Sequence, residues 1–155
     1  MIYIVDKGDI LNFDVEALVN PVNCMGIMGK GLALQFKRSY PENFKAYVDF
    51  CKKENLKPGK LFVYETMLFS NPKYIINFPT KIHWKDYSKL EYIVLGLKAL
   101  RNVIIELDIK SIAVPALGCG LGGLDWESVL YSIKEELKNI PSSVFVFSPQ
   151  KGIET

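Results

Sequence analysis

Short apolar runs alternate along the chain with longer stretches in which apolar residues recur every three or four positions. The short runs are rich in β-branched and aromatic residues and predict strands at 2–5, 17–20, 61–66, 74–78, 111–115 and 144–147. The run at 111–115 is almost entirely apolar, which is typical of a central parallel strand buried on both faces. Prolines follow the runs at 17–20 and 74–78 and are expected to end those strands.

The longer stretches predict three helical regions. The first begins near Lys30 and is restarted by Pro41. The second is expected to be capped by Ser88, with Glu91 three residues on completing a capping box, and the third by Asp125. Strands that alternate with helices in this order predict an α/β domain, with helices covering a mixed, mostly parallel sheet.

Length and composition support one compact domain. The chain has 155 residues, of which 49% are hydrophobic, so residues 1–150 form a single predicted domain and 151–155 a tail without core pattern. With no long apolar run and no leader-like start, a soluble, cytoplasmic, monomeric protein without membrane partner is expected. The scattered cysteines 24, 51 and 119 are expected to be free thiols, and no spacing predicts a metal or redox cofactor.

The net charge of +2 argues against binding to duplex DNA through bulk charge, although it leaves room for a local basic groove.

Two glycine-rich loops, at 23–31 and 118–123, each lie between a predicted strand and a predicted helix. Glycine lets the backbone approach a ligand and turn its N–H groups towards an anion, and the following helix N-terminus adds partial positive charge. One such loop could equally be a tight turn, but the pair favours a diphosphate held between them. The first loop lacks the spacing of a Walker A motif, and the GxGxxG pattern of the second lies too late for a dinucleotide fold.

The segment 77–84 combines a strand end with reactive side chains. Lys81, the chain's only histidine His83, and Trp84 follow the predicted strand, a usual place for chemistry in α/β proteins. Lys81 alone could be a solvated surface lysine, and His83 could make only a structural hydrogen bond. Trp84 could stack on a base or cover the core, and Lys30 and Lys85 could meet phosphates or solvent.

These motifs together resemble a known family. Residues 8–10, 17–23, 23–31 and 114–120 resemble the macrodomains, which bind ADP-ribose and are three-layer α/β/α sandwiches. Residues 28–36, 122–126 and above all the NFPTKxHW motif at 77–84 are similar to the DarG group of macrodomains. That group removes ADP-ribose from thymidine in DNA modified by the toxin DarT.

The resemblance implies a role for each matching position. Asp9 would accept a hydrogen bond from the adenine amino group. Lys81 and Asn23 would be catalytic, Asn23 by orienting the distal ribose near its anomeric carbon, with His83 as a secondary candidate. His83, Trp84 and Lys85 are further candidates for contact with the base or the DNA. The implied ADP-ribose-binding set is Gly8, Asp9, Ile10, Asn20, Asn23, Gly26, Met28, Gly29, Lys30, Gly31, Thr80, Gly118, Cys119, Gly120, Leu121, Gly122 and Gly123.

The leading functional hypothesis is therefore a hydrolase that removes ADP-ribose from thymidine in single-stranded DNA. No cofactor is expected, since ADP-ribose is the product, and the toxin DarT is a further expected partner through a region outside this chain. The alternatives are removal of ADP-ribose from glutamate on protein and a non-catalytic reader of ADP-ribose. Whether Lys81 attacks the ribose or assists the leaving base stays open at this stage.

Overall fold

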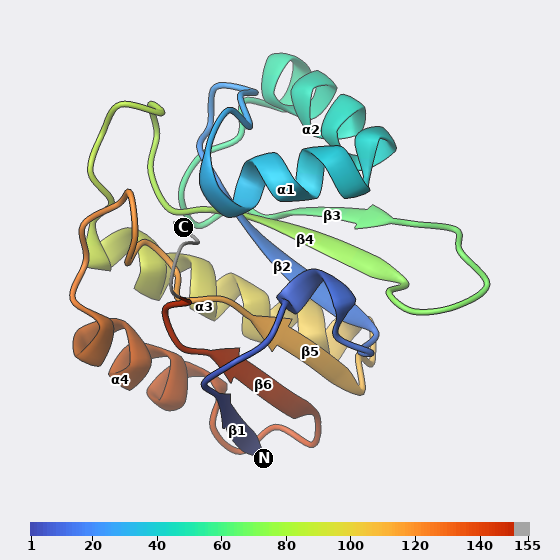
Figure 1. Ribbon diagram of the computed structural model, residues 1–155, viewed down its shortest axis with the longest axis vertical. Helices are drawn as coiled ribbons and strands as arrows, with labels where there is room; N and C mark the ends of the chain where they lie inside the picture. Colours follow the sequence, from blue (N-terminus) through green and yellow to red (C-terminus); the bar gives the residue numbers. More distant parts are fainter. Residues whose placement is uncertain (151–155) are drawn as a thin grey trace.

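The computed structural model, which describes residues 1–150, shows a six-stranded sheet with helices on both faces (Figure 1). The strand order is β1-β6-β5-β2-β4-β3, and every neighbouring pair is parallel except β3 and β4. The strands are β1 (Ile2–Val5), β2 (Ala17–Val22), β3 (Phe62–Glu65), β4 (Tyr74–Pro79), β5 (Ser111–Val114) and β6 (Ser143–Phe147). The predicted mixed, mostly parallel sheet is confirmed.

The helices form the two outer layers. Helices α1 (Gly31–Ser39) and α2 (Pro41–Glu54) lie together on one side of the sheet, and α3 (Leu90–Glu106) and α4 (Trp126–Leu137) pack on each other across the other side (Figure 1). A short 3₁₀ helix, η1 (Ile10–Asn12), follows β1. The three-layer α/β/α sandwich is therefore confirmed, and no helix within residues 1–150 is long and apolar enough to cross a membrane.

The central strands are buried on both faces. In β2, Ala17 and Val19 pack with the core under α3 and α4, whereas Leu18 between them packs with the core under α1. In β5, Ile112 and Ala113 divide between the two cores in the same way. This two-sided burial explains why these strands are continuous apolar runs instead of alternating ones.

Three local predictions are wrong. Strand β2 runs through Pro21 to Val22, and β4 includes Pro79, because the two strands stay in register up to the pair Val22 and Pro79. The pairing of β2 with β5 stops at Leu18, so beyond it that side of β2 needs no ladder bond. Helix α3 is not capped by Ser88: its N-cap is Lys89, which makes no side-chain cap bond.

Ser88 instead belongs to the packing of the second glycine loop. Its backbone N–H donates to the carbonyl of Gly122 at 2.9 Å, and its buried hydroxyl oxygen has no partner among the described residues. The other predicted cap is confirmed, because the Asp125 carboxylate accepts a bond from the Ser128 N–H at 3.1 Å.

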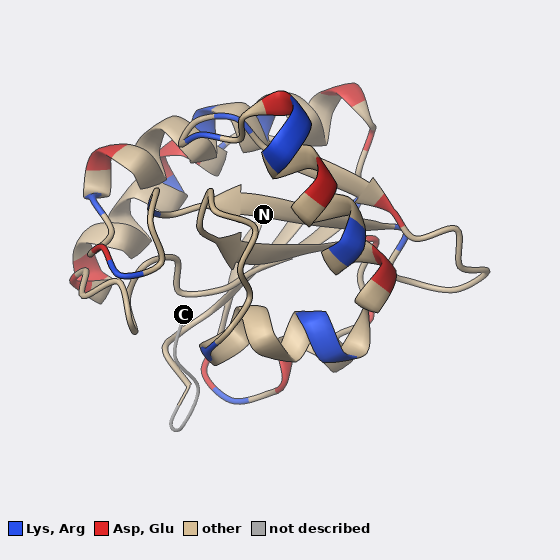
Figure 2. Cartoon of the chain, turned by 90° about the horizontal axis from the view of Figure 1, so that it is seen from above, with Lys and Arg blue, Asp and Glu red and all other residues tan. Residues whose placement is uncertain are grey.

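The parallel strands bring five loops to one edge of the sheet. The segments that follow β1, β2, β4, β5 and β6 all leave from the carboxyl ends of those strands, which is where open α/β sheets bind ligands. Basic and acidic residues are interspersed over the rest of the molecule (Figure 2), in keeping with the small net charge.

Candidate active site

An elongated cleft runs along this edge, past the start of α1. Its first part, with a volume of about 80 Å³, is lined by Pro21, Val22, Asn23, Ile27, Gly29, Lys30, Leu32, Ala33, Thr80, Lys81, Trp84 and Leu121. Its second part, of about 40 Å³, is lined by Gly8, Ile10, Leu32, Pro115, Ala116, Gly120, Phe147, Ser148, Pro149 and Gln150. Leu32 lines both parts, so one continuous surface joins the loops after β1, β2, β4, β5 and β6.

Lys81 enters the first part of the cleft from the segment after β4. That segment is held beside the first glycine loop, because the Cys24 N–H donates to the carbonyl of Ile82 at 2.8 Å and the Thr80 N–H to that of Val22 at 2.9 Å. Lys81 is half-buried. Burial lowers the pKa of its ammonium, and the nearby Asp86 carboxylate opposes this effect only in part. The neutral amine, which is the nucleophilic form, is thereby favoured.

Asn23 and Tyr47 shape the first glycine loop. The Asn23 amide donates to the carbonyl of Ile27 at 2.8 Å, while its side-chain oxygen accepts from the Met25 N–H at 2.9 Å. The fully buried Tyr47 of α2 directs its hydroxyl at both oxygens of Asn23, at 2.8 and 2.9 Å. Asn23 thus lines the cleft with an amide already oriented by three neighbours, and one of its two amide N–H groups has no hydrogen-bond partner among residues 1–150.

Two glycines of the second glycine loop are required by close packing. A Cβ on Gly122 would lie 2.2 Å from the Ser88 hydroxyl oxygen and 2.6 Å from the carbonyl oxygen of Gly118. Gly118 has φ +72°, and a Cβ there would lie 2.8 Å from the Leu124 side chain. Of the predicted positions in this loop, Gly120 and Leu121 line the cleft.

The outer wall of the first part is a tight turn at residues 83–86. The Lys85 N–H donates to His83 Nδ1 at 3.1 Å, and the His83 N–H donates to the Asp86 carboxylate at 3.1 Å. His83 therefore has a structural hydrogen bond through Nδ1, which leaves Nε2 to carry the ring proton. Its ring stacks on Trp84 with 5.4 Å between centroids, and of these residues Trp84 lines the cleft.

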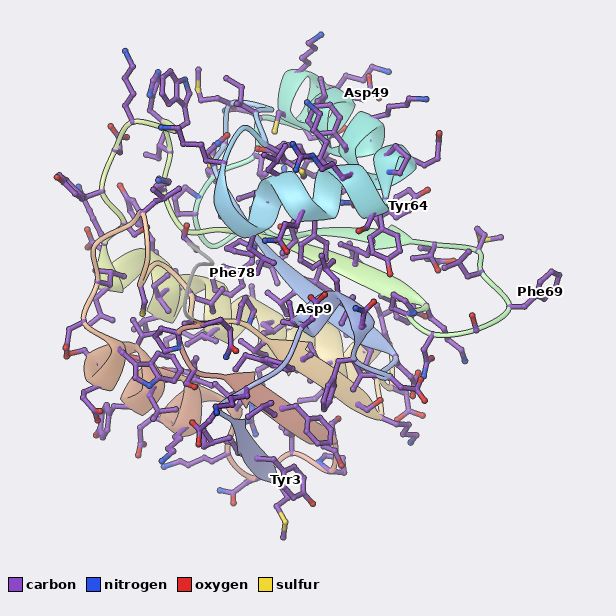
Figure 3. All side chains as sticks on the ribbon, in the orientation of Figure 1. Tyr3, Asp9, Asp49, Tyr64, Phe69 and Phe78 are labelled. Atoms are coloured by element: carbon purple, nitrogen blue, oxygen red, sulfur yellow. The ribbon has the colours of Figure 1, made fainter. Side chains whose placement is uncertain are left out.

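Asp9 lies at the other end, at the start of η1 (Figure 3). Its two carboxylate oxygens accept bonds from the Leu11 N–H at 3.0 Å and the Asn12 amide at 2.9 Å. These bonds fix a carboxylate beside the Gly8 and Ile10 positions that line the second part of the cleft, and each oxygen keeps a lone pair for an amino group.

Several predicted binding residues lie behind the cleft. Gly26 faces α2, Met28 is buried in the core, and Cys119 directs its thiol at the carbonyl of Leu117. Burial, with a smaller contribution from the Asp125 carboxylate, raises the pKa of the Cys119 thiol to about 12, so this thiol is not a nucleophile at neutral pH. Only its backbone remains available to a ligand.

A buried amide network under the cleft was not assigned from the sequence. The Asn77 oxygen accepts bonds from the amides of Asn20, at 3.1 Å, and Asn43, at 3.2 Å, and the Asn77 amide donates to Asn43 at 2.9 Å. All three side chains are fully buried. The sequence signal was present, since polar residues interrupt the strands at 20 and 77, but their partner on α2 could be found only from the fold. Asn20 thus supports the site from beneath.

Searches for similar proteins agree with this architecture. A model of the Macro domain family matches residues 19–133. The DNA ADP-ribosyl glycohydrolase of Mycobacterium tuberculosis is 54% identical over 146 residues, which cover 94% of this chain and 42% of that protein. The protein of the same name from Thermus aquaticus is 48% identical over 92% of this chain and 40% of its own length. The chain spans about two fifths of the length of these curated relatives.

Solved structures give the same result. The macrodomain of Mycobacterium tuberculosis DarG superposes with a TM-score of 0.93 at 52% identity, over 97% of this chain and 99% of that one. Thermosipho africanus DarTG in complex with ADP-ribose superposes with a TM-score of 0.86 at 34% identity, over 96% of this chain and 42% of that one. The chain belongs to the macrodomain family and, within it, to the DarG group.

Proposed function

We propose that this protein hydrolyses the glycosidic bond between ADP-ribose and thymidine in single-stranded DNA, with Lys81 as its catalytic residue. The observation that carries the proposal is the half-buried amine of Lys81, which lines the cleft with Asn23 and has a lowered pKa. Relatives that match almost the whole chain are named DNA ADP-ribosyl glycohydrolases, which supports the substrate. ADP-ribose would lie along the cleft, with its adenine near Asp9 and its distal ribose near Lys81.

The lowered pKa of Lys81 favours a nucleophilic step. The neutral amine attacks the anomeric carbon, a carbon–nitrogen bond forms, and the bond to the thymine nitrogen breaks. The proton that leaves the lysine nitrogen is taken up by the departing base. Water then cleaves the lysine–ribose bond, which releases ADP-ribose and restores the amine.

The loops supply the remaining functions. The N–H groups of the two glycine loops and the start of α1 would bind the diphosphate, and Thr80 lines the cleft close to Lys81. At the mouth, Trp84 is the candidate platform for the modified base, with His83 and Lys85 beside it. We place no cofactor in the reaction. Binding to the toxin DarT belongs to the same proposal, because a similar chain is a fusion of the transferase and the glycohydrolase.

The deciding experiment compares two substrates. Wild-type protein is incubated with DNA carrying ADP-ribosyl-thymidine and, in parallel, with protein carrying ADP-ribosyl-glutamate, and the ADP-ribose released is quantified. Release from the DNA alone is expected. Release from the protein alone would move the substrate to glutamate, and release from neither with retained ADP-ribose binding would leave a reader.

Variants of two lysines test the role of Lys81. Lys81→Ala is expected to abolish release from the DNA while ADP-ribose binding, measured by calorimetry, is largely kept. Lys134→Ala removes the same charge from the exposed surface of α4 and is expected to behave as wild type. Full activity of Lys81→Ala would exclude the lysine mechanism.

A further inference from the structure

A second hollow lies immediately beside the mouth of the cleft. Six residues that line it are Ile82, Lys85, Asp86, Tyr87, Lys89 and Tyr92, and its volume is about 560 Å³. We call it the flanking groove. Ile82 of the groove directly follows Lys81 of the cleft in the chain, and Lys85 of the groove directly follows Trp84 of the cleft, so the two hollows are lined by neighbouring residues of one loop.

Aromatic rings and lysines alternate along this groove. Within nine residues the chain places Trp84, Tyr87 and Tyr92, and the side chains of Trp84 and Tyr87 are 42% and 78% exposed. The Lys85 ammonium lies 5.0 Å from the centre of the Trp84 ring, and the Lys89 ammonium lies 5.4 Å from that of Tyr92. Aromatic faces that carry neighbouring cations are the usual means of holding single-stranded nucleic acid without reading its sequence.

The charge of the groove suits a phosphate backbone. Lys85 and Lys89 are exposed, and none of the salt bridges among the described residues involves either of them. The one acidic residue of the lining, Asp86, already accepts the His83 N–H at 3.1 Å. The groove therefore offers two cations that take part in no salt bridge among the described residues, and one carboxylate that already accepts a backbone hydrogen bond.

The substrate also requires such a surface. A thymidine within a DNA strand is joined to a nucleotide on each side, so when ADP-ribose fills the cleft the strand must cross its mouth at Lys81 and Trp84. The flanking groove adjoins that crossing point.

We propose that the flanking groove binds the single-stranded DNA next to the modified thymidine. Tyr87 stacks on a neighbouring base and Lys85 and Lys89 contact the phosphates on either side. This inference rests on the proposed function, because the DNA is placed by the thymidine at Lys81.

The test compares a long and a short substrate. We measure kcat/KM for two substrates: an ADP-ribosylated oligonucleotide of about ten nucleotides, which is within the usual range of single-strand site sizes, and ADP-ribosyl-thymidine alone. The quantity compared between variants is the ratio of the first kcat/KM to the second. Tyr87→Ala is expected to lower this ratio about five-fold or more, the range found for the loss of one stacking contact. The double variant Lys85→Ala/Lys89→Ala is expected to lower it further at low salt and to flatten its salt dependence. The matched control is Tyr131→Ala, which removes a ring that is 67% exposed on α4.

The ratio of the two kcat/KM values distinguishes an effect on the flanking groove from an effect on the cleft. The Tyr87 ring lies close to Gly123, where an added Cβ would be 3.1 Å from it, so Tyr87→Ala can damage the second glycine loop; such damage would lower both rates and leave the ratio unchanged. An unchanged ratio in both variants would overturn the proposal, as would an equal fall on an ADP-ribosylated peptide of similar length.

A separate binding experiment distinguishes failure of this inference from failure of the proposed function. Fluorescence anisotropy with unmodified single-stranded oligonucleotide measures the groove directly. If wild-type protein released no ADP-ribose from either substrate, the proposed function would fail. The proposal that the flanking groove binds DNA would then be supported only if wild-type protein binds this oligonucleotide and both variants bind it more weakly. It would be rejected if wild-type protein does not bind it.

Discussion

Gly96 of α3 lies directly against the ring of Phe78 in β4. A Cβ on Gly96 would be 2.3 Å from Cζ of Phe78 and 2.5 Å from Cε1, closer than any real contact. Phe78 is fully buried and belongs to the same core as Ile93 and Leu97 of α3. The absence of a side chain at Gly96 therefore sets how closely the helix approaches β4, the strand that Lys81 follows.

Gly96→Ala is expected to destabilise the fold by about 1–3 kcal/mol, the usual cost of overpacking a core. At an unconstrained helix position the same change would stabilise by about 1 kcal/mol, so the sign itself is diagnostic. Urea unfolding measures the difference. The penalty should be smaller when Gly96→Ala is made in a Phe78→Leu background, where the clashing ring is gone, and an equal penalty in both backgrounds would contradict the contact.

The pH dependence of catalysis follows from the pKa of Lys81. Burial lowers this pKa from the ordinary lysine value, so kcat/KM should rise with pH and level off below the usual lysine range. Asp86 raises the pKa of Lys81, so Asp86→Asn should move the rise to lower pH, while the amide oxygen can still accept the His83 N–H. Asp108→Asn, at the turn after α3, is the control. A shift to higher pH in Asp86→Asn would be incompatible with this electrostatic pairing.

The same shift has a consequence for stability. Because the folded pKa of Lys81 is lowered, the unfolded chain binds more protons between the folded pKa and the ordinary lysine pKa. The contribution of Lys81 to stability should therefore increase as pH rises through that window.

Tyr47→Phe removes the hydroxyl that holds the first glycine loop. Asn23 loses the one buried hydroxyl proton that its two oxygens share, so we expect a loss of about 1 kcal/mol in the free energy of unfolding. ADP-ribose affinity should fall as well, because the loop is less well ordered before binding. Calorimetry and denaturant titration measure the two effects. Phe44→Leu, on the same helix, is the comparison for altered packing alone, and it should leave affinity closer to wild type.

Asn43→Ala opens the buried amide network. Asn77 would lose its donor and its acceptor on α2 but would keep the Asn20 amide as donor and the Phe62 carbonyl as acceptor, so the expected cost is about 1–2 kcal/mol for the two buried hydrogen bonds lost. Asn102→Ala, on the exposed surface of α3, makes the same chemical change and should have little effect. Equal unfolding midpoints for the two variants would show that the network adds nothing to stability.

Much of the fold could be predicted from periodicity, because the central strands and amphipathic helices bury continuous apolar faces. The errors fell where a tertiary contact outweighs local preference. Pro21 continues its strand because the pairing of β2 with β5 has already ended at Leu18, and Pro79 continues its strand because the pairing of β4 with β3 has ended at Asn77. Ser88 leaves its capping position to pack under Gly122. None of these partners is near in sequence.

The loops that form the site could be predicted from the sequence, but the buried polar side chains that hold those loops in place could not. Motifs placed Lys81, Asn23 and the glycine loops, and the structure brings them to one cleft. The hydroxyl of Tyr47 and the amide of Asn43 could not be assigned in advance, because helical spacing marks a buried position without saying what its polar atom meets. The packing role of Gly122 was hidden for the same reason.

The direction of the strands also decides where this domain can be joined to other molecules. Strand β6 runs parallel to its neighbours, so Ser148, Pro149 and Gln150 leave it at the rim of the cleft and line its second part. The amino group of Met1 lies at the opposite edge, bound to the carbonyl of Ser142 at 3.0 Å. A polypeptide fused behind Gln150 would start beside the second part of the cleft, whereas an affinity tag fused ahead of Met1 would start at the opposite edge of the sheet.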